Sequence, residues 1–288
     1  MLGSLGETDN ERINEALQNW WQGDVVLEAD AFMIHLADRE FPLTPSARAD
    51  AENVGVEQNI FDVLMPVCGW VVISQTCDIV KKCADSEFVE VCRLVRIEDD
   101  GHFQDVRKGR RPRYAYVPGL ADRKLVADLE HTMTIEKSVL VRCSRVQGCA
   151  TDKERVAFAE ALARKRKRFA FPDGFNTGLR KFRDSIKDKH GKNSSEGRLV
   201  DAIHEIRIQP NPGWGGQKVT VFFWVLLRQG VLQDFDTARA DVKKWLSRVT
   251  LSGTFVLADP AFALVEPRDM TVEDYFNSYP LDYDDVSP

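Results

Sequence analysis

The sequence has no apolar run approaching the roughly 20 residues that a membrane-spanning helix requires. Its first residues, MLGSLGETDNE, lack the basic start and the apolar core that are typical of a secretory signal. Hydrophobic residues make up 43% of the 288 residues and charged residues 29%, as in ordinary soluble globular proteins. We therefore expect a cytoplasmic protein that does not insert into a membrane.

Closely spaced cysteine pairs are also missing, although the chain contains six cysteines. A structural zinc site is usually marked by pairs such as Cys-x-x-Cys, and none occurs here. Five residues separate Cys77 from Cys83, and five separate Cys143 from Cys149. The sequence therefore predicts reduced thiols, and neither a metal nor another cofactor.

Charge is distributed unevenly along the chain, whose net charge is −6. Residues 1–60 carry 12 acidic and 3 basic side chains, whereas residues 142–198 carry 16 basic and 7 acidic ones. Lys and Arg side chains gathered on one surface attract nucleic-acid phosphates. The same surface could bind an acidic protein surface instead, so both kinds of partner stay open. Nothing in the sequence indicates an oligomeric state.

The length of 288 residues favours two domains, and the order of strand-like and helix-like segments predicts an α+β protein. The first domain is expected over residues 1–148. It begins with an amphipathic helix around Leu17 and continues with short apolar strands. Residues 42–57 are expected to form a polar loop or a mobile flap. The polar and basic segment 98–118 predicts a long hairpin arm.

The second domain is expected over residues 149–288, because Thr151 and Glu154 fit a capping box at a helix start. Further along, IHEIRIQP and VTVFFWVLL predict a hairpin whose second strand is central. An amphipathic helix follows, and TFVLA and FALV predict two more strands. The expected product is a C-terminal α+β domain that begins with a basic segment.

The most distinctive segment of the first domain is WVVISQTCDIV followed by FVEVCRLV, two strand-like runs around a polar loop. Side chains at a strand end are held by a rigid scaffold, which suits catalysis. We therefore name Ser74, Thr76 and Asp78 as candidate catalytic residues, with Asp78 as the base. The alternative is that Asp78 only forms a turn.

Taken in order, GDVVLEADAF, VVISQ, FVEVCRLV and KLVADLEHTMTIEKSVL resemble the strands of the toxin barrels in the MazF/PemK family of messenger-RNA endonucleases. The resemblance covers about half of the chain. It implies a small curved β barrel, SH3-like or PemK-like, with a flanking helix. It also implies metal-independent RNA cleavage in a bacterial toxin–antitoxin or anti-phage defence system.

Two arginines of that family are not matched. Before the central strand, where the family usually has one, this chain has Cys68, Gly69 and Trp70; beside the opening Gly-Asp it has Trp21 and Gln22. Cleavage of RNA without a metal needs a cation close to the phosphate. That cation must come from the arm at 107–113, from the second domain, or not at all. The candidate nucleic-acid-binding residues are Arg107, Arg110, Arg111, Arg113, Arg164, Lys165, Arg166, Lys167 and Arg168.

Cys77 is a further candidate, as a nucleophile activated by His131 or His35. A free cysteine beside an apolar strand more often serves as a small core residue. The sequence is compatible with two functions. The first is a nucleic-acid-binding protein that cleaves RNA as an effector. The second is a non-catalytic adaptor or regulator whose degenerate barrel binds a protein partner.

Overall fold

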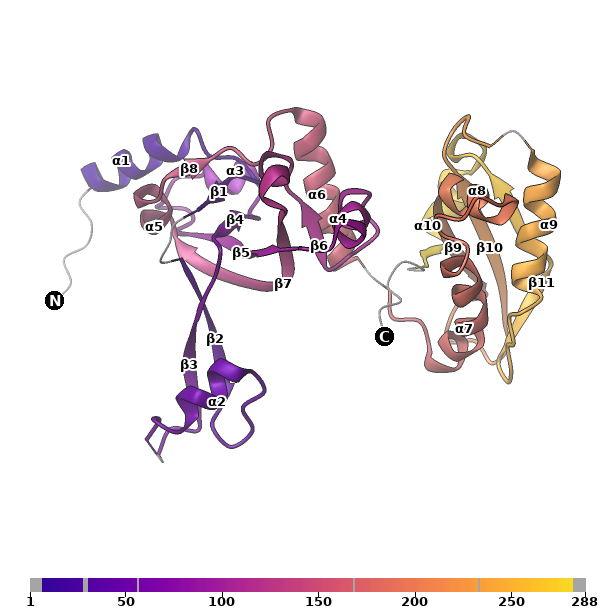
Figure 1. Ribbon diagram of the computed structural model, residues 1–288, viewed down its shortest axis with the longest axis horizontal. Coiled ribbons are helices and arrows are strands. Elements are labelled where there is room, and N and C mark those ends of the chain that lie inside the picture. The colour runs from indigo at the N-terminus through magenta and orange to yellow at the C-terminus, as the bar shows by residue number, and fades with distance from the viewer. Residues whose placement is uncertain (1–6, 28–30, 56, 168, 233, 282–288) are drawn as a thin grey trace. The chain divides into compact units, whose positions relative to one another are not determined.

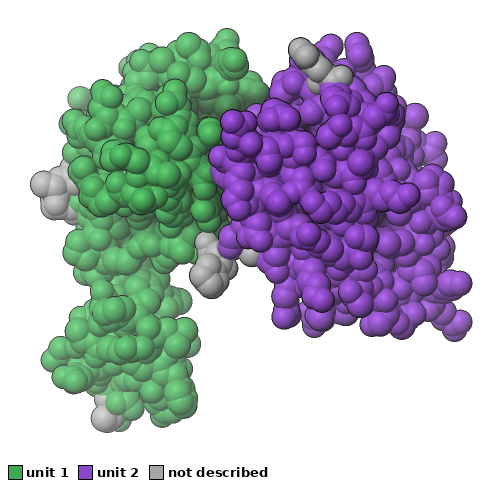
Figure 2. Space-filling view, turned by 45° about the vertical axis from the view of Figure 1, so that its right-hand side comes forward, with its two compact units in different colours: residues 1–166 green, residues 167–288 purple. Residues whose placement is uncertain are grey.

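The protein is described by a computed structural model that covers residues 7–27, 31–55, 57–167, 169–232 and 234–281 (Figure 1). It is a mixed α+β protein of two compact units, Met1–Arg166 and Lys167–Pro288 (Figure 2). The expected boundary at 148/149 is displaced to 166/167. The reason is the helix α6 (Asp152–Arg166), whose Phe158 is buried in a core cluster of the first unit. The expected capping box is confirmed, because Glu154 accepts hydrogen bonds from the amides of Ala150 and Thr151.

A six-stranded antiparallel sheet with the order β6-β7-β5-β4-β1-β8 forms the centre of the first unit. Within the described residues it is not closed into a barrel, so the expected SH3-like or PemK-like barrel is not confirmed. One backbone hydrogen bond, from Gly119 to the carbonyl of Gly148, joins the segments that follow the two edge strands. The strands are β1 (Val25–Val26), β4 (Trp70–Val72), β5 (Phe88–Arg96), β6 (Tyr114–Tyr116), β7 (Leu125–Glu136) and β8 (Arg145–Val146).

The two faces of this sheet pack against different elements, because side chains alternate along each strand. Leu94 and Ala127 lie on the inner face, in the same cluster as Phe158 of α6. On the outer face, Val91 packs in a cluster with Leu17 and Leu140 from helices α1 and α5. The remaining helical segments of this unit are α1 (Glu7–Leu17), α2 (Pro45–Ala51), α3 (Thr76–Ile79), α4 (Asp100–Arg107), α5 (Lys137–Arg142) and the 3-10 turn η1 (Pro118–Arg123).

The expected arm at 98–118 is wrong, since this segment forms α4 and the short strand β6. Asp99 caps α4 by accepting a hydrogen bond from the His102 amide at 2.6 Å. Phe103 and Val106 of α4 are buried against the outer face of the sheet. Apolar residues four and seven places from the cap thus dock this basic segment on the sheet instead of leaving it free.

Residues 31–66 form a separate β hairpin, β2 (Phe32–Asp38) with β3 (Ile60–Pro66), that projects from the rest of the first unit (Figure 1). The segment expected as a polar loop or flap, 42–57, contains the helix α2. Thr44 caps α2 by accepting a hydrogen bond from the Ala47 amide, and Pro45 occupies its first position.

The second unit is a four-stranded sheet with the order β11-β10-β9-β12 and a helix-covered face. The expected hairpin is confirmed, with β9 (Ile203–Asn211) antiparallel to the central β10 (Val219–Leu227). The two strands expected from TFVLA and FALV are a single strand, β11 (Phe255–Val265), which begins after Thr254, runs parallel to β10 and carries a register shift. The other elements are α7 (Asp173–Lys187), α8 (Ser195–Ala202), α9 (Phe235–Leu246), η2 (Pro267–Asp269), α10 (Val272–Phe276) and β12 (Tyr279–Pro280).

None of the helices in the described part of the chain is long and apolar enough to span a membrane.

Candidate site around Asp128

A break in strand pairing creates the most unusual polar cluster of the first unit. Arg93 of β5 pairs with Asp128 of β7, but the preceding residue, Cys92, pairs with Thr132. Residues 129–131 therefore have no partner on β5 and form a bulge. Bulges redirect side chains and occur frequently beside functional sites. Here the bulge brings His131 back to the side of the strand on which Asp128 lies.

The Asp128 carboxylate binds three side chains from three places in the sequence. Its Oδ2 accepts hydrogen bonds from Arg93 Nη2 at 2.6 Å and Nε at 2.9 Å. Arg113 donates from Nε to Oδ1 and from Nη2 to Oδ2, both at 3.0 Å. Nδ1 of His131 lies 3.1 Å from Oδ2. We call Arg93, Arg113, Asp128 and His131 the Asp128 cluster.

Asp128 itself is fully buried, with 0% of its surface exposed. Burial alone would raise the pKa of this carboxyl, but the hydrogen bonds from Arg113 and Arg93 outweigh it and lower the pKa to about 2. The hydrogen bond to Asp128 in turn raises the pKa of Arg113. The charges of both residues are therefore maintained at neutral pH, and the carboxylate fixes the positions of its partners.

The partners of Asp128 reach the surface, although the carboxylate does not. The side chain of Arg113 is 40% exposed and that of His131 37% exposed. Glu130, in the bulge, pairs with Arg113 at 3.2 Å and with Lys165 of α6 at 3.1 Å. The three positive charges of Arg93, Arg113 and Lys165 thus exceed the two negative charges of Asp128 and Glu130. The surface beside the imidazole of His131 is therefore positive. Such a surface can bind an anion and exchange a proton with it.

Arg93 and Asp128 form charged hydrogen bonds that are strong enough to be buried, because they lie between two apolar clusters on the outer face of the sheet. On the outer face, Val91 belongs to one apolar cluster and Val126 to another, and Arg93 and Asp128 lie between them. Nη1 of Arg93 also contacts Met65 Sδ at 3.5 Å. Apolar neighbours on both sides exclude water and strengthen the charged hydrogen bonds.

The structure brings together the two basic segments that the sequence identified separately. Lys165 reaches Arg113 through Glu130. Arg164 lies next to Gly109, since a Cβ added at Gly109 would be 3.5 Å from Arg164 Nη1. The end of α6 and the loop between α4 and β6 therefore share one surface, which we call the basic surface.

The other predicted nucleic-acid-binding residues have surroundings of their own. Arg111 pairs with Asp105 at 3.0 Å, and Arg110 lies 3.9 Å from the same carboxylate. The Arg107 guanidinium is 5.9 Å from the centre of the Tyr116 ring. Arg166 and Lys167 are exposed, whereas Arg168 falls outside the described residues.

The predicted catalytic residues Ser74, Thr76 and Asp78 lie elsewhere, after β4 and in α3. The Ser74 hydroxyl accepts a hydrogen bond from the Glu90 amide at 2.7 Å, and the Thr76 hydroxyl accepts one from the Gln22 amide at 3.2 Å. Both hydroxyls thus join neighbouring segments of the chain. Asp78 is exposed in the single turn of α3.

Arg113 does not supply the cation that RNA cleavage at the Ser74–Asp78 loop would require. Arg113 binds Asp128 instead, and in the sheet β6 is separated from β4 by β7 and β5. The expectation that the 107–113 segment supplies a catalytic cation to Asp78 is therefore wrong for Arg113. Sheet order, which the sequence does not reveal, decides the outcome.

The pairing of Cys77 with a histidine, which the sequence left as one alternative, is not formed. Cys77 Sγ lies 3.6 Å from Gln75 Oε1, while His131 contacts Asp128 and His35 lies 3.4 Å from the Thr44 hydroxyl. All six cysteines are free thiols. No group of three or more potential metal ligands occurs within the described residues.

Arg93, Asp128 and the partnership of His131 with Asp128 were not identified from sequence. One signal for them exists, because Asp128 interrupts the apolar run LVADL, where a buried carboxylate requires a paired cation. The sequence does not show which cation. No protein-family model and no curated protein sequence matches the chain.

Proposed function

We propose that the protein binds nucleic acid on the basic surface and cleaves RNA without a metal ion at the Asp128 cluster. The observation that supports this most directly is a single buried carboxylate that holds two arginines and one histidine at a partly exposed position. The proposal transfers the expected chemistry from Asp78 to His131, since at His131 two arginines and a proton acceptor are bound to the same buried carboxylate.

RNA cleavage of this kind uses the 2′-hydroxyl as the nucleophile. The oxygen of that hydroxyl attacks the adjacent phosphorus, the bond to the 5′-oxygen breaks, and the hydroxyl proton passes to a base. With its Nδ1 proton donated to Asp128, His131 has a free lone pair on Nε2 and can accept that proton. Arg93 and Arg113 would stabilise the negative charge that develops on the phosphorus oxygens. The leaving 5′-oxygen takes its proton from solvent.

The basic surface would hold the rest of the strand. Lys165, Arg164 and Arg166 extend the positive charge from the Asp128 cluster along the end of α6. Basic residues in a last helical turn also complement the helix dipole, so part of this run stabilises α6 in any case. The link from Lys165 through Glu130 to Arg113 is what joins the helix end to the proposed site of chemistry.

The test is cleavage of a mixture of structured and single-stranded RNA by the full-length protein, with and without EDTA. We expect cleavage that persists in EDTA and is lost by at least a hundredfold in His131→Asn, since general base catalysis contributes about 10²–10⁴-fold. His35→Asn is the matched control, because His35 lies on the hairpin beside Thr44. Asp78→Ala tests the Ser74–Asp78 loop against the Asp128 cluster, and we expect this variant to cleave RNA like the wild type.

Two results would overturn the proposal. One is the absence of cleavage by wild-type protein that binds RNA. The other is activity that survives in His131→Asn and is lost in Asp78→Ala, which would return the chemistry to the Ser74–Asp78 loop.

A further inference from the structure

The β2–β3 hairpin exposes an unusual amount of apolar surface on one of its faces. Directly paired residues share a face, so Phe32, Ile34 and Leu36 lie on the same side as Leu64 and Ile60. These five side chains are exposed by 41%, 43%, 72%, 55% and 60% in the same order. We call this set the hairpin face. Contiguous exposed apolar side chains of this kind mark interaction sites.

The opposite side of the hairpin is an ordinary core. Phe61 and Val63 are buried there under Ala47 of α2, and Met33 is buried in the cluster on the outer face of the main sheet. In Figure 1, α2 lies beside the hairpin that projects from the sheet. The sequence thus supplies apolar residues for both sides of β2 and β3, but the described residues of the first unit cover only one of them.

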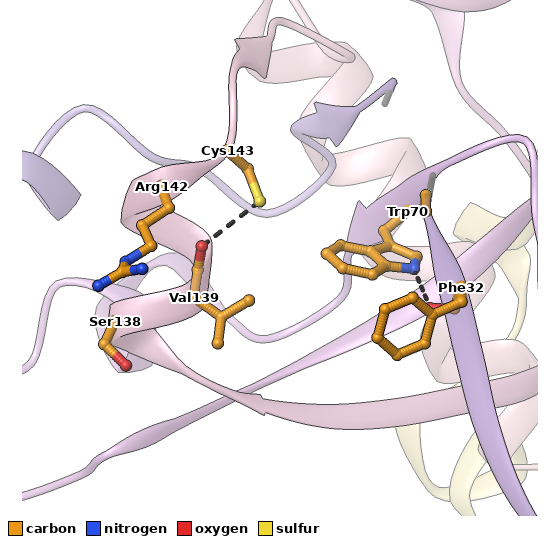
Figure 3. A pocket seen from close by; sticks show the side chains of 7 residues that line it. Phe32, Trp70, Ser138, Val139, Arg142 and Cys143 are labelled. Atoms are coloured by element: carbon orange, nitrogen blue, oxygen red, sulfur yellow. Dashed lines mark hydrogen bonds between the residues drawn. The ribbon is translucent and has the colours of Figure 1, made fainter. Parts of the chain in front are cut away.

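The hairpin face continues into a pocket of 330 Å³ at the base of the hairpin. Phe32, Trp70 and Val139 line it, from β2, β4 and α5 (Figure 3). The Phe32 and Trp70 rings meet edge to face, with centroids 6.4 Å apart, and the Trp70 indole donates a hydrogen bond to the Phe32 carbonyl at 2.8 Å. The rings therefore have fixed positions, and a side chain can enter beside them without a rearrangement of the pocket.

Charge around the hairpin face indicates what binds there. Residues 31–66 carry six acidic and two basic side chains, a net charge of −4. Asp62 pairs with Leu36 and Asp38 pairs with Ile60, so both carboxylates lie within the hairpin face itself. We propose that this face docks a segment of another protein that has apolar side chains flanked by Lys or Arg.

Other occupants fit less well. A second copy of the hairpin would bring Asp38 and Asp62 against the same carboxylates, which is unfavourable. Nucleic acid and anionic lipid carry the same sign of charge as the hairpin and are repelled. An amphipathic basic segment matches both the apolar side chains and the carboxylates of Asp38 and Asp62. Because Arg142 also lines the pocket, the side chain that enters it is an apolar one. This surface is separate from the proposed nuclease site, and it gives the alternative of protein-partner binding a location on the molecule.

The probe is a synthetic, fluorescently labelled peptide of alternating leucine and lysine, compared with one in which glutamate replaces each lysine. Binding to the full-length protein is measured by fluorescence anisotropy. We expect the lysine peptide to bind at least about tenfold more tightly than the glutamate peptide, since repulsion acts against the second.

The variants test whether the hairpin face is the place of binding. Leu36→Ser with Leu64→Ser should weaken binding of the lysine peptide by about tenfold or more, because two apolar contacts are lost. Val272→Ser is the matched control, since Val272 is 71% exposed but lies in α10 of the second unit. Asp38→Lys with Asp62→Lys should reverse the preference towards the glutamate peptide. All replaced side chains are exposed, but Asp38 Oδ1 also accepts hydrogen bonds from the backbone amides of Glu40 and Phe41, so circular dichroism of each variant checks that the fold is retained.

Several outcomes overturn the proposal. Equal binding of the two peptides would show that charge does not select the partner. Unchanged binding of the lysine peptide by the Leu36→Ser, Leu64→Ser variant would show that the hairpin face is not the binding site. Sedimentation that shows a wild-type dimer, dissociated in the same variant, assigns the face to a second copy of the chain. Binding to phosphatidylserine vesicles that is lost in this variant assigns it to a membrane surface.

Discussion

Both units of this protein contain a buried carboxylate that binds two cations, and the two sites differ in the groups that surround these ion pairs. In the first unit Asp128 binds Arg93 and Arg113. In the second, Glu196 of α8 binds Lys189 at 2.5 Å and Lys244 of α9 at 2.8 Å. Hydrogen bonds from its lysines lower the pKa of Glu196 to about 2, the same value as that of Asp128.

The difference lies in geometry and neighbours. Glu196 sits in the first turn of a helix and joins α8 to α9 and to the loop after α7, which is a structural role. Asp128 sits beside a strand bulge, where its partners converge with His131 and with the basic end of α6. A buried ion pair is therefore weak evidence for function by itself. What distinguishes Asp128 is the acid–base group and the charged surface beside it.

The largest expected effect that tests this comparison is on stability. Asp128→Asn leaves Arg93 without its counter-charge in a position where its side chain is only 19% exposed, so the first unit should lose about 3–5 kcal/mol of unfolding free energy. Glu196→Gln should cost about 1–2 kcal/mol, because the lysines are 30% and 55% exposed and can turn to water. Native-state hydrogen exchange by mass spectrometry measures each unit separately.

Equal losses in the two variants would remove the distinction between the sites. The amides of β5 and β7 report the first unit, and those of β9 and β10 report the second.

The next effect is the dependence of stability on pH. The pKa of Asp128 falls from 3.8 to about 2 on folding, so the carboxylate stabilises the native state above its unfolded pKa. That contribution, about 2 kcal/mol, is lost as the pH falls through the native pKa. Urea unfolding of wild type and Asp128→Asn between neutral and strongly acidic pH should show it. The difference in stability between the two proteins should shrink by about that amount towards the acid end.

Glu196 acts in the same direction, since its pKa is also lowered. The second unit should therefore keep its own acid sensitivity in Asp128→Asn. If the variant removes acid sensitivity from both units alike, the two carboxylates do not act independently.

The smallest expected effect is on nucleic-acid affinity. Arg164→Glu with Arg166→Glu should weaken binding of single-stranded RNA by about tenfold and make the salt dependence less steep by about two units of slope. The matched control reverses two basic residues of the second unit, Arg239→Glu with Lys243→Glu, both exposed on α9. Fluorescence anisotropy over a range of salt concentrations measures both quantities. A flat salt response in wild type would remove nucleic acid as a partner.

Local patterns predicted many of the elements, because local physics decides them. The Thr151–Glu154 capping box begins α6, and the apolar run of VTVFFWVLL forms the central strand β10. The same reasoning was wrong for residues 98–118, since the two buried side chains of α4 are difficult to recognise in a basic segment. The domain boundary was also placed too early, because α6 packs on the preceding sheet.

The candidate site could be predicted only in part. Arg113 and the basic end of α6 were identified as basic residues, and His131 as a titratable one. Their convergence was not, because Arg93 and Asp128 are 35 residues apart and meet through one register of β5 on β7. Slipping that register by one residue would point Asp128 to the inner face. Side-chain identity alone contains no information about register.

By itself, the sequence determined the α+β class, the acidic and basic segments and most of the individual strands and helices. Each of these depends on residues close together along the chain. Tertiary structure decided which cations reach Asp128 and which face of the hairpin stays uncovered, because both depend on strand order, register and the surface that each element finds to pack against.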